Sequence, residues 1–340
     1  MPAQPTRALF WEKLPDGKTQ CSLCAHRCLI AGGKRGICGV RENRGGVLYS
    51  LVYGKAIAAH VDPIEKKPLF HFLPGTLSYS LATAGCNFRC LNCQNADISQ
   101  MPREDGAIVG RDLSPETAAE EAERLSCRSV SYTYTEPTIF FEYAAEIAAA
   151  ARARGLKNVF VTNGYMTAEA REASASWLDA ANVDLKFFRD SSYREICGSR
   201  LQPVLDTIVG MKKRGIWVEV TTLVIPDLND SDAELKDIAS FVSATGPEIP
   251  WHVSAFHPAY RLTGVGRTPA ASLARARRIG RETGLRYVYT GNIPGDEGEN
   301  TVCHRCGKEI VSRLGFQVTG LRIREGKCAF CGEPAAGVWD

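Results

Sequence analysis

Thirteen cysteines are the feature that most constrains this 340-residue chain. A chain of this length can bury a core large enough to fold without disulfide bonds, and disulfides do not persist in a reducing cytosol. Metal binding therefore explains the cysteines better than cross-linking does. Eleven of them fall into three tight groups. The other two, Cys127 and Cys197, are assigned no role, because free cysteine is commonly a small buried hydrophobic residue.

The composition excludes several classes of protein. With 44% hydrophobic and 23% charged residues, the chain is expected to fold and not to be disordered. Its 41 basic and 38 acidic residues leave a net charge of +3, which is too balanced for a nucleic-acid or membrane-surface protein. The first residues are polar, and no apolar run reaches transmembrane length, so we expect a cytoplasmic protein without a membrane partner.

The C-terminal group consists of two C-x2-C pairs, Cys303/Cys306 and Cys328/Cys331. Each pair places two thiolates on one tight turn, and two such turns complete the tetrahedron of a structural zinc site. A rubredoxin-like iron site would use the same ligands, because ligand softness alone does not separate zinc from iron. We expect zinc, since a tail of about 45 residues is too small for a core of its own and a metal would hold it together.

Four further cysteines lie close together near the N-terminus: Cys21, Cys24, Cys28 and Cys38. Four thiolates would close either a zinc site or an iron–sulfur site, and zinc is the first expectation. His26 lies within the same span, but four cysteines already satisfy the coordination number. The histidine is therefore not assigned as a ligand.

The middle group has only three cysteines, Cys86, Cys90 and Cys93. Three thiolates hold three irons of a [4Fe–4S] cubane and leave the fourth iron open to a ligand, whereas a structural site would be closed. The C-x3-C-x2-C spacing resembles the signature of radical S-adenosylmethionine (SAM) enzymes, with Asn92 where many members carry an aromatic residue. The alternative is a structural metal site that is completed by a distant fourth ligand.

Between residues 76 and 290, apolar strand-like runs alternate with helical patterns, which predicts βα units and a parallel sheet. Capped helix starts at Ser114, Thr167 and Ser231 support the pattern. We expect an α/β fold, with a partial (β/α)6 TIM-like barrel at 76–295, a cysteine-rich extension at 1–75 and a zinc-ribbon-like segment at 296–340. A weaker seventh strand is expected near 286–290, after strands at 77–83, 129–134, 159–163, 182–187, 216–225 and 251–256.

Polar residues stand on or just after each of the six expected strands. In such barrels, the loops that leave the carboxyl ends of the strands build one mouth, so we expect these residues to meet there. Each alone would more often be a cap, a turn or a core residue, but their joint placement favours a site. They are the cysteine loop, Thr135-Glu136-Pro137, Thr162-Asn163-Gly164, Asp184-Leu185-Lys186, Thr221-Thr222 and His257-Pro258.

With these motifs, the chain resembles the radical SAM enzymes of the glycyl-radical-activating type, and more narrowly the radical SAM enzyme of the AmmeMemoRadiSam system. The resemblance covers almost the whole chain. The segments that carry it are 21–38, 62–72 (DPIEKKPLFHF), the cysteine loop as far as Asn95, 132–137 (YTYTEP), 161–164 (VTNG), and 300–303 through 337–339.

This resemblance implies roles for the site residues. The three loop cysteines would hold the [4Fe–4S] cluster, and its open iron would take the amino and carboxylate groups of SAM. Glu136 matches the glutamate of the superfamily's Gly-Gly-Glu motif and would accept hydrogen bonds from the methionine amino group. Tyr134 and Thr135 replace the two glycines, which are the residues that permit close backbone approach. Of the other residues, Thr162 and Asn163 would face the ribose, Lys186 the methionine carboxylate or substrate, and His257 the adenine.

The implied reaction is reductive cleavage of SAM to a 5′-deoxyadenosyl radical, which takes hydrogen from an unknown substrate such as a protein or peptide. The implied partners are an electron donor such as flavodoxin or ferredoxin and a co-occurring Memo-like protein. A first alternative is an activase that installs a glycyl radical in a partner enzyme, although the extra cysteines do not form the two-cluster ferredoxin insert common in such activases. An alternative of another class is a zinc-ribbon module that binds protein or nucleic acid.

The segment 62–72 mixes acidic, basic and aromatic residues. We expect either a lid over the barrel mouth or an ordinary surface loop with a satisfied ion pair. The N-terminal extension and the zinc tail would cap the mouth or grip a partner.

Overall fold

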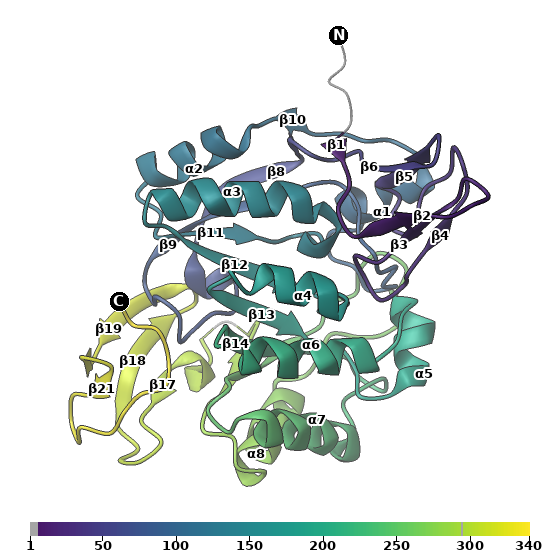
Figure 1. Ribbon diagram of the computed structural model, residues 1–340. Coiled ribbons are helices and arrows are strands. Elements are labelled where there is room, and N and C mark those ends of the chain that lie inside the picture. Colours follow the sequence, from purple (N-terminus) through teal and green to yellow (C-terminus); the bar gives the residue numbers. More distant parts are fainter. Residues whose placement is uncertain (1–5, 294) are drawn as a thin grey trace.

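A computed structural model of the chain describes residues 6–293 and 295–340 (Figure 1). Its centre is an eight-stranded sheet in which seven strands run parallel and one edge strand runs antiparallel. The strands, in their order across the sheet, are β16 (Val288–Gly291), β15 (Trp251–Ala255), β14 (Trp217–Val224), β13 (Ala180–Asp184), β12 (Lys157–Thr162), β11 (Ser129–Tyr132), β9 (Leu77–Ala82) and β8 (Ala58–Pro63).

The seven parallel strands confirm the expected βα pattern, and their observed bounds lie within a few residues of the expected ones. In the described part of the chain, the edge strands β16 and β8 do not pair with each other, so the barrel is partial. The antiparallel strand β8 was not expected. Its sequence AAHVDP contains one β-branched residue and ends in proline, which is a weak strand signal and suits an edge position.

Helices follow the parallel strands and pack against the sheet (Figure 1). Three of them begin at the expected caps, where the hydroxyl oxygens of Ser114, Thr167 and Ser231 accept hydrogen bonds from backbone N–H groups of the first turn. The helices are α1 (Ala96–Glu104), α2 (Pro115–Arg124), α3 (Phe141–Ala153), α4 (Ala168–Ser174), α5 (Asp190–Ser192), α6 (Gln202–Lys213), α7 (Asp232–Thr245) and α8 (Ala270–Glu282).

The N-terminal cysteines lie in a small β unit of two three-stranded sheets. One sheet contains β1 (Thr6–Arg7), β6 (Val47–Ser50) and β5 (Arg41–Arg44), and the other contains β2 (Trp11–Lys13), β3 (Thr19–Cys21) and β4 (Leu29–Ile30). A further pair, β7 (Lys55–Ala56) with β10 (Arg111–Asp112), joins the chain that follows this unit to the segment before α2. The division at residue 75 stays a prediction, and β8 within 1–75 belongs to the barrel sheet.

Residues 64–73, which we call the plug, close the barrel at the amino ends of its strands. The plug residues Ile64, Leu69, Phe72 and Leu73 are buried together with Val159 and Ala180 of β12 and β13. The cysteine loop instead follows the carboxyl end of β9. The expectation of a lid or an ordinary surface loop was therefore wrong, because apolar residues within 62–72 bury themselves against the strand starts.

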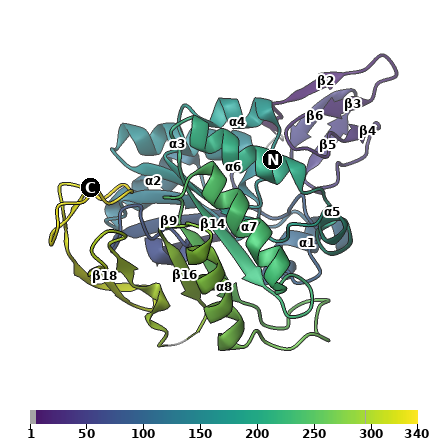
Figure 2. The ribbon, with the colours of Figure 1, turned by 90° about the horizontal axis from the view of Figure 1, so that it is seen from below.

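The C-terminal segment forms small antiparallel sheets beside the plug. The bridge between Phe72 and Val338, and the hydrogen bond from Leu73 N to Val338 O at 2.7 Å, join the two. In both ribbon views this segment and the N-terminal unit lie at opposite ends of the molecule (Figures 1 and 2). Its strands are β17 (Thr301–Val302), β18 (Glu309–Leu314), β19 (Gln317–Leu321), β20 (Ile323–Arg324) and β21 (Lys327–Cys328).

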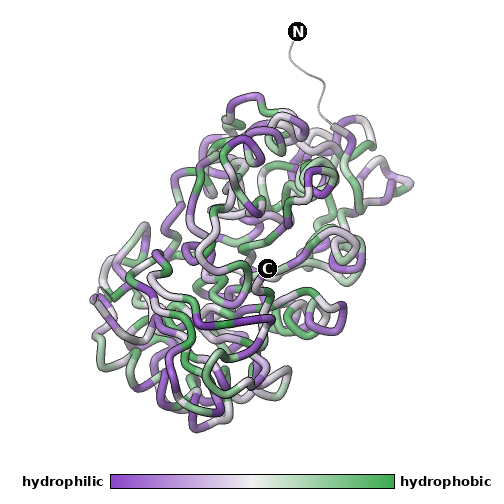
Figure 3. The backbone as a smooth tube through the Cα atoms, turned by 90° about the vertical axis from the view of Figure 1, so that its left-hand side faces the viewer, coloured by the Kyte–Doolittle hydropathy of each residue, from purple (hydrophilic) through white to green (hydrophobic). Residues whose placement is uncertain are grey.

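Hydrophilic and hydrophobic stretches are interspersed along the backbone of the described residues (Figure 3). No helix within residues 6–293 and 295–340 combines the length and the apolar character needed to cross a membrane.

Candidate active site

The three loop cysteines lie together at the carboxyl end of the sheet. Cys90 is buried, and Cys86 and Cys93 are half-buried. Burial raises the pKa of the Cys86 thiol, and the charges of Glu136, Cys90 and Cys93 raise it further, so these groups lie near one another. Such thiols ionise readily only when a positive group compensates their charge. Three clustered thiols with no fourth cysteine of the loop fit a [4Fe–4S] group with one open iron.

Gly85 allows the cysteine loop to pass close to the N-terminal unit. Its φ of +101° lies in the region that favours glycine. A Cβ at this position would lie 2.6 Å from Cγ1 of Val40 and 3.1 Å from the carbonyl oxygen of Cys38. Any side chain here would therefore push the cysteine loop away from the residues that support it.

Glu136 joins the ends of β11 and β12. Its Oε1 accepts hydrogen bonds from Thr138 N at 3.0 Å, Thr138 Oγ1 at 2.5 Å and Thr162 Oγ1 at 2.7 Å. Its Oε2 accepts one from Asn163 N at 2.8 Å. Burial raises the pKa of this carboxyl group, and these hydrogen bonds act to lower it. A carboxylate has about four acceptor sites. Oε2 accepts only one of these bonds and can accept another, and direct contact between Glu136 and SAM stays a prediction.

Asn163 connects the end of β12 to the cysteine loop. Its Nδ2 donates to Asn87 Oδ1 at 2.7 Å and lies 3.9 Å from Cys86 Sγ. Its Oδ1 accepts from Tyr165 N at 3.0 Å, which fixes the orientation of the amide. The structure thus brings Glu136, Thr162 and Asn163 to the cysteine loop, as the sequence predicted.

Tyr134 stands where the superfamily motif has its first glycine, and it adopts a glycine-like conformation with φ of +62°. Such a conformation costs a non-glycine residue about 1–2 kcal/mol, so other contacts must hold it. Asn95 Nδ2 donates to Tyr134 O at 2.7 Å, and the Tyr134 hydroxyl donates to Asp62. Lys67 Nζ lies 4.5 Å from the centre of the Tyr134 ring. The missing glycine is therefore compensated by contacts with the cysteine loop, β8 and the plug.

Lys67 is buried and binds Asp62, with Nζ 2.7 Å from Oδ2. Burial lowers the pKa of Lys67 to about 8, although the Asp62 carboxylate acts to raise it. Lys66 Nζ contacts the other Asp62 oxygen at 2.8 Å. Sequence reasoning assigned none of these residues to the site, since the segment that carries them was expected to be a lid or a surface loop.

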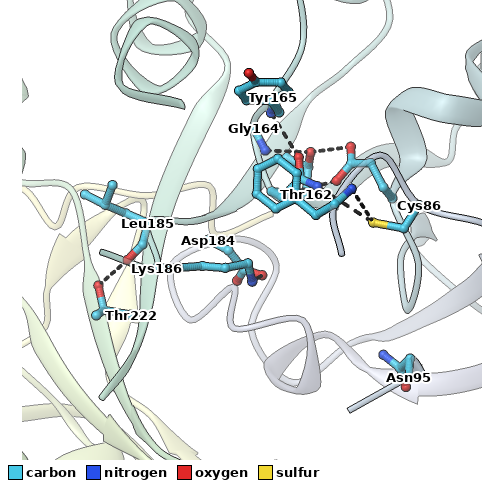
Figure 4. Close-up of polar contacts among 12 residues, drawn as sticks. Cys86, Asn95, Thr162, Gly164, Tyr165, Asp184, Leu185, Lys186 and Thr222 are labelled. Atoms are coloured by element: carbon cyan, nitrogen blue, oxygen red, sulfur yellow. Dashed lines mark hydrogen bonds and ion pairs between the residues drawn. The ribbon is translucent and has the colours of Figure 1, made fainter. Parts of the chain in front are cut away.

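Three other expected site residues differ in their surroundings. Lys186 pairs with Asp184, with Nζ 2.6 Å from Oδ2 (Figure 4). Burial acts to lower the pKa of Lys186, but the charges of Asp184 and of the Cys90 thiol raise it well above its ordinary value. Thr222 is a packing residue, because its Oγ1 donates to Leu185 O and accepts from Trp251 Nε1. His257 follows β15 and is half-buried, and its expected contact with adenine stays a prediction.

Cys197, which was assigned no role, supports the cysteine loop through its backbone. It ends a short π-helical turn, and its carbonyl oxygen accepts a hydrogen bond from Arg89 N at 3.0 Å. Leu91 N donates to Ile196 O at 2.9 Å in the same way. Sequence spacing contains no signal for this contact, because the two segments are about one hundred residues apart.

The N-terminal cysteine group lies beside the cysteine loop, and the C-terminal group lies in the segment beside the plug. The C-terminal four have all their sulfurs within 4.8 Å of one another, so they could hold a metal ion. The N-terminal four lie near one another but are more widely spaced. Burial raises the pKa of Cys24 well above its ordinary value, and the thiols of Cys21, Cys38 and Cys28 raise it further. Metal binding at the N-terminal four stays a prediction.

Comparison with known proteins identifies the family. Residues 80–241, from β9 through most of α7, match the sequence profile of the Radical SAM superfamily. The chain is also 47% identical over 329 residues to an uncharacterized protein, MJ0808, of Methanocaldococcus jannaschii, covering 96% of this chain and 97% of that one. The chain belongs to the radical SAM superfamily. Membership implies SAM and a [4Fe–4S] cluster as cofactors, which the three loop thiols fit.

This radical SAM protein is homologous to glycyl-radical activating enzymes. It is 24% identical over 228 residues to the benzylsuccinate synthase activating enzyme of Thauera aromatica, which covers 61% of this chain and 69% of that one. Its fold resembles the crystal structure of a radical SAM methyltransferase from Sphaerobacter thermophilus, with a TM-score of 0.50 at 14% identity. That match covers 70% of this chain and 71% of the methyltransferase, and it concerns the fold alone.

Proposed function

We propose that this protein is a radical SAM enzyme that cleaves SAM reductively and uses the product to take hydrogen from a protein or peptide substrate. The observation that carries the proposal is the open group of three thiols beside Glu136 and Asn163 at the carboxyl end of the sheet. When bound, the [4Fe–4S] cluster and SAM supply a 5′-deoxyadenosyl radical after one-electron reduction. The residues of the chain bind, orient and enclose these groups.

The chain supports SAM binding by fixing polar groups around the cysteine loop. Asn163 and Thr162 are locked by hydrogen bonds to Asn87 and Glu136, which suits contacts with a ribose. Lys186 places a cation near Cys90, where a methionine carboxylate would lie, and His257 is the candidate for the adenine. The plug closes the opposite end of the barrel, which limits the entry of water from that side.

The finer assignment is a radical SAM enzyme of the AmmeMemoRadiSam system, with a Memo-like protein as a partner and flavodoxin or ferredoxin as the electron donor. The motifs 62–72 and 132–137 support this assignment. Thirteen cysteines without a disulfide in the structure suit the reducing cytoplasm. The C-terminal four cysteines would hold zinc.

The test is anaerobic. The purified chain is reconstituted with iron and sulfide, mixed with SAM and a strong reductant, and assayed for 5′-deoxyadenosine. We expect product from the wild type and none from Cys90→Ala. Cys127→Ala is the matched control, because Cys127 is also buried but lies just before β11, away from the loop, and it should retain activity. A wild type that carries a reduced cluster and still makes no product would contradict the proposal.

A second candidate function is activation of a glycyl-radical enzyme, which the likeness to the benzylsuccinate synthase activating enzyme favours. The activase would form a stable complex with a large partner that contains the target glycine. An affinity pull-down with the anaerobic protein, followed by electron paramagnetic resonance of the partner, separates the two functions. A glycyl-radical signal supports the activase, and substrate-dependent SAM cleavage without it supports the first proposal.

A further inference from the structure

The distances between sulfur atoms divide the three cysteine groups into two kinds. Within the described residues, the C-terminal four are the only Cys, His, Asp or Glu ligands that lie, three or more together, within 4.8 Å of one another. Cys303 and Cys331 are 3.7 Å apart at Sγ, and Cys306 and Cys328 are 3.8 Å apart. Tetrahedral Zn–S bonds of about 2.3 Å place sulfurs about 3.8 Å apart, so this group has the size of one ion.

The N-terminal cysteines are neighbours, but among the described residues no three of their sulfurs lie within 4.8 Å of one another. They are Cys21, Cys24, Cys28 and Cys38. The sulfurs of Cys86, Cys90 and Cys93 are also not all within 4.8 Å of one another, and the superfamily uses these three cysteines for a cubane. A cubane holds its cysteine sulfurs farther apart than one ion does, because irons and sulfides lie between them. The N-terminal group and the cluster loop are thus both wider than the C-terminal group, as a cubane requires.

Arg41 adds an independent observation beside the N-terminal cysteines. It is 1% exposed, and one of its nitrogens, Nη2, contacts Glu142 Oε1 at 3.1 Å. Its other two nitrogens, Nε and Nη1, are buried and have no hydrogen-bond partner among the described residues. Burial acts to lower the pKa of Arg41, but the charges of Glu142 and of the thiols of Cys21, Cys38 and Cys24 raise it, so these thiols lie around the guanidinium. Buried donors are nearly always satisfied, so an anionic thiolate–metal group with sulfur acceptors fits this place.

The N-terminal cysteines also lie directly against the loop that carries the SAM cluster. Arg103 donates both to Ile37 O, at 3.2 Å, and to Phe88 O, so one side chain joins the two loops. His26 Nε2 lies 2.8 Å from Asn87 O. The carbonyl oxygen of Cys38 approaches Gly85, the residue before Cys86. The loop that carries the N-terminal cysteines and the loop that carries Cys86 are therefore in direct contact.

We propose that Cys21, Cys24, Cys28 and Cys38 hold a second iron–sulfur cluster, through which electrons enter the SAM-cleaving site. An external one-electron donor reduces this cluster, which returns to its oxidised state when it passes the electron to the neighbouring cluster. No covalent bond of the protein changes in this step. The electron-transfer part rests on the proposed function, whereas the metal assignment does not. This proposal replaces the first expectation of zinc at these cysteines.

The metal assignment is tested by metal content, with no enzymatic assay. The triple variant Cys86→Ala/Cys90→Ala/Cys93→Ala, which lacks the SAM cluster, is reconstituted anaerobically, and its iron, sulfide and zinc are counted by mass spectrometry and colorimetry. We expect about four irons per chain in the variant against about eight in the wild type, and about one zinc, from the C-terminal site, in both. The variant should also show a paramagnetic signal after reduction.

Two results would overturn the proposal. One is a triple variant without iron and with about two zinc ions per chain, which would make the N-terminal site a zinc site. The other is a folded triple variant with neither iron nor a second zinc. A wild type with about four irons per chain, as many as the triple variant, would show that Cys86, Cys90 and Cys93 hold no cluster. That result would contradict the proposed function and not the second cluster, so the two failures are distinguishable.

Arg41 gives a second, independent measurement. Removal of a buried positive charge beside a cluster makes its reduction harder, so Arg41→Met should lower the midpoint potential of the second cluster. Arg41→Lys, which keeps the charge, should restore most of that potential. An unchanged potential in Arg41→Met would remove the argument that this guanidinium faces the cluster.

Discussion

Glu219 is the residue on which closure of the barrel base depends most directly. It lies on β14 and is fully buried, and its two oxygens accept four hydrogen bonds. Oε1 accepts from His71 N at 2.8 Å and Trp217 Nε1 at 3.0 Å, and Oε2 accepts from Phe70 N at 3.0 Å and contacts His252 Nε2 at 2.6 Å. Two of these donors are backbone groups of the plug.

The substitution Glu219→Gln keeps the shape of the side chain but replaces one acceptor oxygen with an NH2 donor. Two buried donors then face another donor. Each buried donor without a partner costs about 1–3 kcal/mol, so we expect a loss of about 2–6 kcal/mol in the free energy of unfolding. The plug should also loosen, because Phe70 N or His71 N loses its acceptor.

The assay is urea denaturation followed by tryptophan fluorescence, together with hydrogen exchange at the amides of residues 70 and 71. Glu169→Gln is the matched control, since Glu169 pairs with Arg27 at a site where both side chains are about half exposed. That exposed pair should contribute below about 1 kcal/mol. A Glu219→Gln protein with the stability of the control and unchanged exchange at both amides would refute the reasoning.

Three further predictions concern other parts of the molecule. Burial lowers the pKa of His71 from 6.5 to about 4, so the unfolded chain takes up a proton that the folded chain does not; stability should fall by about 3 kcal/mol between pH 6.5 and 4, and His71→Gln should flatten that part of a pH–stability profile. Gly85→Ala forces a Cβ to within 2.6 Å of Val40, so iron bound at the cysteine loop, measured after reconstitution, should decrease while secondary structure by circular dichroism persists. Cys306→Ser should release the C-terminal zinc, measured by mass spectrometry, without changing the iron content of the barrel.

Much of the barrel could be predicted from local sequence patterns. Apolar runs separated by capped helices placed the seven parallel strands, and Ser114, Thr167 and Ser231 mark helix starts because their hydroxyls satisfy exposed backbone N–H groups. Cysteine spacing identified the C-terminal group, whose four sulfurs could hold a metal ion, because each C-x2-C turn is a local feature of the sequence.

The remaining features depend on contacts between distant segments. The segment 62–72 was expected to be either a lid over the mouth or a surface loop, because its sequence does not indicate which end of the barrel it contacts. The sequence shows that Tyr134 replaces a glycine of the superfamily motif, but not that Asn95 and Lys67 contact it in the glycine-like conformation. The hydrogen bonds that Glu136 accepts from Thr138, Thr162 and Asn163 likewise depend on how β11 and β12 lie side by side, which the sequence alone does not give.

The base of the barrel joins two segments that are far apart in the sequence, the plug at 64–73 and the C-terminal segment at 313–336. This has a consequence for the order of folding. Arg313 Nη2 donates to Phe70 O across 243 residues, and His71 Nδ1 contacts Ala336 O across 265. During synthesis, all seven parallel strands leave the ribosome before the residues that complete this base. A nascent chain that stops near residue 296 would contain the whole superfamily match and Glu219, but it would lack Arg313 and Ala336, which bind Phe70 O and His71 Nδ1. The base of the newly made barrel therefore gains these contacts only after residues 313–336 have been synthesised.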